Sequence, residues 1–126
     1  MVARKQHRKL FPQTKISETF LIFAAPLSDA MGSEITKNRF EKILTIAFTV
    51  WNSVVLDTVA GNSKHVAHIR RLTAGDPMMA AMIEQMICRK KDIFLDDHRL
   101  IGEYTLAHKN GEWRLWAEAR SPIPLD

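Results

Sequence analysis

The sequence is poor in cysteine, since Cys88 is the only one in 126 residues. A disulfide framework within one chain is therefore excluded, and a reducing intracellular compartment is the default expectation. No uninterrupted apolar segment follows the basic N-terminus before Pro12, so we expect no secretory signal. These absences predict a cytoplasmic protein without disulfides.

Long hydrophobic runs are also absent. The longest uncharged stretch covers positions 43–56 and is interrupted by threonine, asparagine and serine. That is shorter than the roughly 20 residues needed to cross a bilayer, so we expect no membrane partner. Apolar residues make up 46% of the chain and charged residues 25%, which is typical of a globular domain.

Established catalytic and cofactor motifs are missing. The chain has no GxxxxGK[ST] phosphate loop, no GxGxxG, no HExxH, no GxSxG, no CxxC and no EF-hand loop. Possible metal ligands are scattered and match no defined spacing, so no metal or cofactor site is predicted. Because no polar constellation is recognisable, an enzyme is the less favoured class.

The net charge of +4 is unevenly distributed. Residues 1–15 hold five of the 18 basic residues and no acidic one, which leaves 13 basic against 14 acidic residues elsewhere. We therefore predict a basic flexible tail over 1–15 and a single globular domain over 16–126. The tail is either a solvated terminus or an arm that contacts an anionic partner such as nucleic acid. The cations of such an arm would be Arg4, Lys5, Arg8 and Lys9.

The hydrophobic periodicity predicts an α+β fold that is predominantly α, with about four helices followed by a C-terminal β-hairpin. Ser17 is the expected N-cap of the first helix, and Pro26 should kink or end that helix. Asp76 followed by proline is the strongest local helix start in the chain. With their caps, the predicted helices cover residues 17–32, 36–61, 62–75 and 76–95.

Asn110 and Gly111 form a type I′ turn signal between two runs that alternate in polarity. If they form the loop, the apolar residues share one face, which should cover the helices. The pairs on that face would be His108–Trp113, Leu106–Leu115 and Tyr104–Ala117. The pairs on the other face would be Ala107–Arg114, Thr105–Trp116 and Glu103–Glu118.

The hairpin is the first candidate interaction surface. Trp113 and Trp116 are three residues apart, so their side chains point to opposite faces. Two interpretations stay open. Either the hairpin lies on the helices with Trp116 partly shielded by the aliphatic stems of Arg114 and Arg99, or it dimerises or extends the sheet of a partner. The candidate interaction residues are Trp113, Trp116 and Tyr104.

The second predicted helix carries a stripe of small uncharged polar residues, Thr45, Thr49, Asn52 and Ser53. A solvated helix face usually carries lysine and glutamate, whereas small polar side chains suit a close contact. The stripe therefore indicates either a second buried side within the monomer or a subunit interface.

Two pairs of charged residues could carry chemistry. Lys90 falls in the apolar sector of the fourth helix, with Asp97 on the same side. We expect the Lys90 amine to reach water at the helix end; an ion pair with Asp97 or a catalytic amine are the alternatives. Glu103 and Glu118, predicted to lie opposite each other, are either solvated, bridged by an arginine or a metal, or partners in acid–base chemistry.

The sequence thus favours a small protein-interaction or homo-oligomeric assembly module, with a homodimer or another protein as the partner. A nucleic-acid-associated accessory protein that uses the basic tail is the second hypothesis. A helix that reads DNA needs polar residues in its first turns, but Pro77, Met78 and Met79 stand there. A small enzyme with a site at Lys90 and Asp97 is the third hypothesis.

Overall fold

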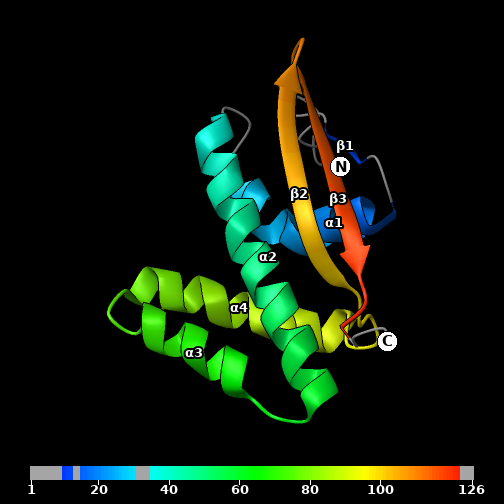
Figure 1. Cartoon of the computed structure of the whole chain (residues 1–126). Helices are drawn as coiled ribbons and strands as arrows, with labels where there is room; N and C mark the ends of the chain where they lie inside the picture. The colour runs from blue at the N-terminus through cyan, green and yellow to red at the C-terminus, as the bar shows by residue number, and fades with distance from the viewer. Residues whose placement is uncertain (1–9, 13–14, 31–34, 123–126) are drawn as a thin grey trace, which may run out of the picture.

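The computed structural model describes residues 10–12, 15–30 and 35–122 (Figure 1). Four helices and three strands follow one another, and the predicted mostly helical α+β fold with a C-terminal hairpin is confirmed. The elements are β1 (Leu10–Pro12), α1 (Lys15–Ala30), α2 (Lys37–Ala60), α3 (Lys64–Thr73), α4 (Pro77–Ile93), β2 (Leu100–Lys109) and β3 (Glu112–Arg120). Figure 1 shows α1 crossing behind the strands and α2 running beside β2.

The predicted caps determine where α2 begins and ends and where α4 begins. The Thr36 side chain accepts a hydrogen bond of 3.2 Å from the backbone N–H of Arg39, and Gly61 ends α2 in the left-handed conformation at φ 72°. The Asp76 side chain caps α4 in the same way, with a proline in the first turn. These boundaries therefore follow from local sequence signals.

The start of α1 differs from the prediction. The helix begins at Lys15, so Ser17 lies in its first turn and the predicted N-cap at Ser17 is wrong. The Ser17 side chain is fully buried, and its Oγ accepts a hydrogen bond of 2.8 Å from the backbone N–H of Ala117. This contact ties α1 to β3.

The helix α1 also continues through Pro26 to Ala30. Proline has no N–H, so the carbonyl of Ile22, four residues earlier, loses its helical partner. Arg89 of α4 supplies the missing donors: its Nη2 lies 2.7 Å from the Ile22 carbonyl oxygen, and its Nε lies 3.0 Å from that of Phe23. A side chain from another helix thus stabilises the proline turn.

The sheet has the order β1-β3-β2. The five register pairs predicted from Tyr104–Ala117 to His108–Trp113 are all present, and the turn residues Asn110 and Gly111 both have positive φ. The ladder shifts between Ile101 and Tyr104, so the predicted opposition of Glu103 and Glu118 is not part of it. β1, which was not predicted, pairs in parallel with residues 113–115 of β3 from within the 1–15 segment.

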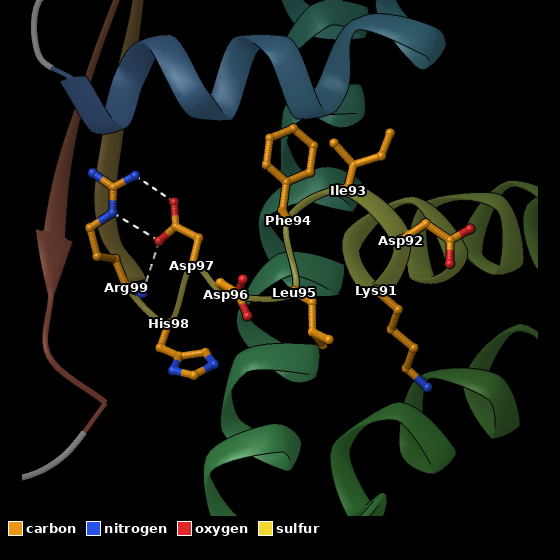
Figure 2. A pocket seen from close by; sticks show the side chains of 9 residues that line it. All are labelled: Lys91, Asp92, Ile93, Phe94, Leu95, Asp96, Asp97, His98 and Arg99. Atoms are coloured by element: carbon orange, nitrogen blue, oxygen red, sulfur yellow. Dashed lines mark hydrogen bonds and ion pairs between the residues drawn. The ribbon is translucent and has the colours of Figure 1, made fainter.

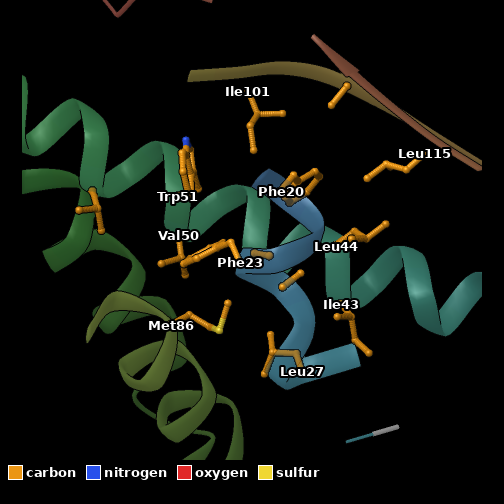
Figure 3. Close-up of a cluster of buried hydrophobic side chains, with 14 of the residues drawn as sticks. Phe20, Phe23, Leu27, Ile43, Leu44, Val50, Trp51, Met86, Ile101 and Leu115 are labelled. Carbon is orange, nitrogen blue, oxygen red and sulfur yellow. The ribbon is translucent and has the colours of Figure 1, made fainter. Parts of the chain in front are cut away.

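The core lies between α2, the sheet and the other helices (Figure 3). α2 contributes residues that are buried along most of its length, including the fully buried Trp51. The ring of Phe23 from α1 packs edge-on against Trp51 at 5.2 Å between centroids. Met86 from α4 and Leu115 from β3 complete the cluster. Burial of this apolar surface is the main term that stabilises the fold.

Candidate functional site

The sheet has one buried and one exposed face. Along β3, Trp113, Leu115 and Ala117 are at most 4% exposed, whereas Trp116 is 42% exposed. The register places the exposed Thr105 of β2 directly beside Trp116. We call the exposed side the outer face; it is carried by alternate residues from Glu112 to Arg120 and by Thr105 and Ala107 of β2.

The other two predicted hairpin residues serve the packing of the monomer itself. Trp113 packs edge-on against Phe40 at 5.1 Å and stacks on His108 at 4.1 Å between ring centroids. The Tyr104 hydroxyl lies 2.7 Å from Oγ1 of Thr45, and burial raises the pKa of this tyrosine. Of the three hairpin candidates, Trp116 is therefore the one on the outer face.

Charged side chains surround Trp116 on the outer face. Nη2 of Arg114 lies 3.2 Å from the Glu112 carboxylate, and Nη2 of Arg120 lies 2.8 Å from that of Glu118. Arg120 also approaches Glu103 at 3.8 Å. Arg120 thus bridges Glu103 and Glu118. Bridging by an arginine was one of the possibilities that the sequence left open for these two glutamates.

Gly102 makes room for this bridge. A Cβ atom at this position would overlap the side chain of Arg120 and approach the carboxylate of Glu118. The glycine lies where the ladder shifts between Ile101 and Tyr104. The absence of a side chain there lets Arg120 lie across β2, and this explains how the two carboxylates share one cation.

The polar stripe of α2 is mostly used inside the monomer. Nδ2 of Asn52 donates to the Ile101 carbonyl at 2.9 Å, and Oδ1 accepts from the Ile101 N–H at 2.8 Å. Thr45 binds Tyr104 as described, Ser53 is buried, and Thr49 is exposed. Because Asn52 satisfies both backbone groups of Ile101, it closes that end of the β2 edge to strand addition.

Lys90 does not reach water, so the leading expectation for it is wrong. The side chain is 1% exposed, and its Nζ donates to the backbone carbonyls of Phe94 at 2.6 Å and Asp97 at 2.9 Å. The amine also lies 4.3 Å from the centre of the Trp51 ring. Burial lowers the pKa of Lys90 to about 8, although nearby carboxylates oppose the shift. Lys90 therefore holds the loop that follows α4.

The structure brings Lys90 and Asp97 together, but the lysine amine contacts the backbone carbonyl of Asp97 and not its carboxylate. The Asp97 carboxylate binds Arg99 instead, with its Oδ2 at 2.5 Å from Nη2 and its Oδ1 at 2.9 Å from Nε. Hydrogen bonds from Arg99 lower the pKa of Asp97. The alternative of a Lys90–Asp97 ion pair is thus not what the structure shows: Lys90 contacts the Asp97 carbonyl, and the Asp97 carboxylate pairs with Arg99.

An open hollow of about 710 Å³ lies over this loop and is lined by residues 91–99 (Figure 2). Figure 2 shows Phe94 and Ile93 pointing toward α1 and Lys91 pointing toward α3, whereas Asp97 and Arg99 point toward each other. Among the described residues no cluster of three or more histidine, cysteine or acidic side chains could hold a metal ion. The acidic and histidine side chains that line the hollow therefore do not form such a cluster.

Asp57 is a buried polar residue that sequence reasoning missed. Its carboxylate, 5% exposed near the end of α2, accepts hydrogen bonds from the backbone N–H groups of His65 and Val66, both at 2.9 Å. Burial by itself would raise the pKa of Asp57, but these bonds and the His65 ring outweigh it and lower the pKa. Asp57 thus caps α3, where the Ser63 side chain makes no cap hydrogen bond.

The helix α2 is long and apolar enough, by length and composition alone, to cross a membrane. Half of its most apolar stretch is buried within the fold, and a core helix passes the same test. The basic residues proposed for a nucleic-acid arm, Arg4, Lys5, Arg8 and Lys9, lie outside the described residues.

No family model matches this chain, and neither a curated protein nor a solved structure is detectably similar to it.

Proposed function

We propose that this protein is a protein-interaction module that binds its partner through the outer face of the sheet. The observation that carries the proposal is the position of Trp116. Trp51 and Trp113 are buried in the core, whereas Trp116 is 42% exposed in the middle of a sheet face. Tryptophan is among the residues that contribute most to binding energy at protein interfaces.

The surroundings of Trp116 support this function. Thr105 beside it is small, and the ion pairs of Arg114 and Arg120 lie on either side along β3. An apolar centre with a polar rim is the usual arrangement of a protein interface. The free edges are less suitable for binding. On β2, Asn52 binds both backbone groups of Ile101. On β3, beyond residues 113–115 that pair with β1, Ser17 accepts from the N–H of Ala117.

The proposal is tested by native mass spectrometry of the protein purified from its own host, with Trp116→Ala as the variant. We expect the wild type in a protein complex and the variant largely uncomplexed. The control is Leu72→Ala, because Leu72 on α3 is 72% exposed and lies outside the sheet. An uncomplexed wild type, or a complex that persists in the Trp116 variant, would refute the proposal.

A further inference from the structure

We infer that the partner on the outer face is a second copy of this chain, with the two β3 strands packed antiparallel across a two-fold axis at Trp116. This inference rests on the proposed function and names its partner. It is carried by the order of charges along β3. The outward residues, in sequence, are Glu112, Arg114, Trp116, Glu118 and Arg120.

The charges are of opposite sign at equal distances from Trp116. Two residues before it stands Arg114, and two residues after it stands Glu118; four residues away, Glu112 is matched by Arg120. A two-fold axis at Trp116 that sets two strands antiparallel brings each residue against the one at the equal and opposite distance. Every charge on β3 then meets its opposite in the second copy, whereas a parallel arrangement would bring like charges together.

The same axis places the two Trp116 side chains at the centre of the interface. The exposed Thr105 lies beside Trp116, and the exposed Ala107 lies beside Arg114. Both are small, so space remains next to each indole for the indole of the second copy. Aromatic pairs of this kind stabilise an interface beyond the area that they bury.

The ion pairs within one chain are compatible with this interface. Arg114 binds Glu112 and Arg120 binds Glu118 in the same strand. In the dimer the Glu112–Arg114 pair of one copy lies against the Glu118–Arg120 pair of the other. Each pair thereby becomes half of a cluster of four charges with alternating sign, and such networks stabilise more than isolated surface pairs do.

Two double variants separate contacts between copies from pairs within the chain. Glu118→Arg with Arg120→Glu exchanges the two charges. It keeps the pair between positions 118 and 120, loses the approach of Arg120 to Glu103, and places Arg114 against an arginine of the other copy. Arg114→Glu with Glu118→Arg removes both pairs within the chain but keeps opposite signs across the axis. Both variants retain the composition of charges and the net charge of the wild type.

Sedimentation equilibrium over a range of concentrations is the measurement, with circular dichroism to confirm that each variant is folded. We expect a dimeric wild type, a dimer in the Arg114–Glu118 variant, and a dimer affinity at least tenfold weaker in the Glu118–Arg120 variant. The control, Arg71→Glu on the exposed side of α3, should remain dimeric.

A wild type that is monomeric at every concentration would overturn the inference, as would a dimer that both double variants leave unchanged or that only the Arg114–Glu118 variant dissociates. The dimer and the proposed interaction surface can be told apart. If the wild type is monomeric alone but Trp116→Ala releases a different bound protein in the native mass spectrum, the interaction surface stands and the second copy is excluded.

Discussion

Lys90 shows how one residue can determine the shape of a loop. A buried lysine is costly unless its charge is solvated by the protein. Here the carbonyl oxygens of Phe94 and Asp97 and the face of Trp51 replace water around the amine. The chain between α4 and β2 therefore folds back over the end of α4, and this places Arg99 where its carbonyl accepts from the Trp51 indole at 2.7 Å.

The lowered pKa of Lys90 predicts a pH dependence of stability. Its pKa is about 8 in the folded protein against 10.5 for an unperturbed lysine, so between these values the unfolded state binds more protons. The free energy of unfolding should therefore rise with pH across this window, by about 2 kcal/mol between pH 8 and 10 from Lys90.

Urea unfolding of the wild type and of Lys90→Met at pH 7, 8, 9 and about 10 checks this prediction. The difference in unfolding free energy between the two proteins removes the contribution of other groups, such as Tyr104, whose pKa is raised. The difference should shift in favour of the wild type above pH 8. A difference that stays constant with pH would show that Lys90 does not titrate in this range.

At the scale of the element, α1 depends on α4 at its proline. Arg89→Met should lower the free energy of unfolding by about 1–3 kcal/mol, because the Ile22 carbonyl loses its charged donor. In a Pro26→Ala background the helix supplies its own N–H to that carbonyl, so the same substitution should cost at least about 1 kcal/mol less. Equal costs in the two backgrounds, measured by urea unfolding, would mean that Arg89 does not compensate for the proline.

The helix α3 depends in the same way on an acid from α2. Asp57→Ala should lower the free energy of unfolding at neutral pH by about 2 kcal/mol, because two backbone N–H groups lose their acceptor. The pKa of Asp57 is below 3.8 in the folded protein, so its contribution is present above that pH and is lost as the pH falls through the folded value.

Comparing Asp57→Asn with Asp57→Ala separates the hydrogen bonds from the charge. The asparagine retains one acceptor oxygen and should be less destabilised than the alanine variant, without the acid-dependent loss. Denaturant unfolding near pH 3 measures this loss. If the wild type exceeds the asparagine variant in unfolding free energy by as much near pH 3 as at neutral pH, the charge of Asp57 is not what stabilises the cap.

At the scale of the whole molecule, the parts of the fold that depend on local signals were predictable. The Asn110-Gly111 turn fixed the hairpin register, and Thr36, Gly61 and Asp76 fixed helix ends, because each acts on backbone groups within a few residues. The outward position of Trp116 followed from strand alternation alone.

Features that join distant parts of the chain were not predictable. β1 pairs with a strand about a hundred positions later in the chain, and the three residues of β1 carry no signal that identifies this partner. The burial of Lys90 depends on a loop whose path the sequence does not specify. Whether the outer face is covered likewise depends on where the helices pack. Hydrophobic periodicity shows which side of a helix or strand is apolar, but it does not show which other element packs against that side.

Quenching of tryptophan fluorescence measures whether two copies meet at the outer face around Trp116. Trp51 and Trp113 are buried, so a soluble quencher such as acrylamide reports mainly on Trp116. If two copies meet there, quenching should decrease as the protein concentration rises from nanomolar to high micromolar. Quenching that stays at the same high level across that range would rule out this dimer, because Trp116 would then remain in water at every concentration.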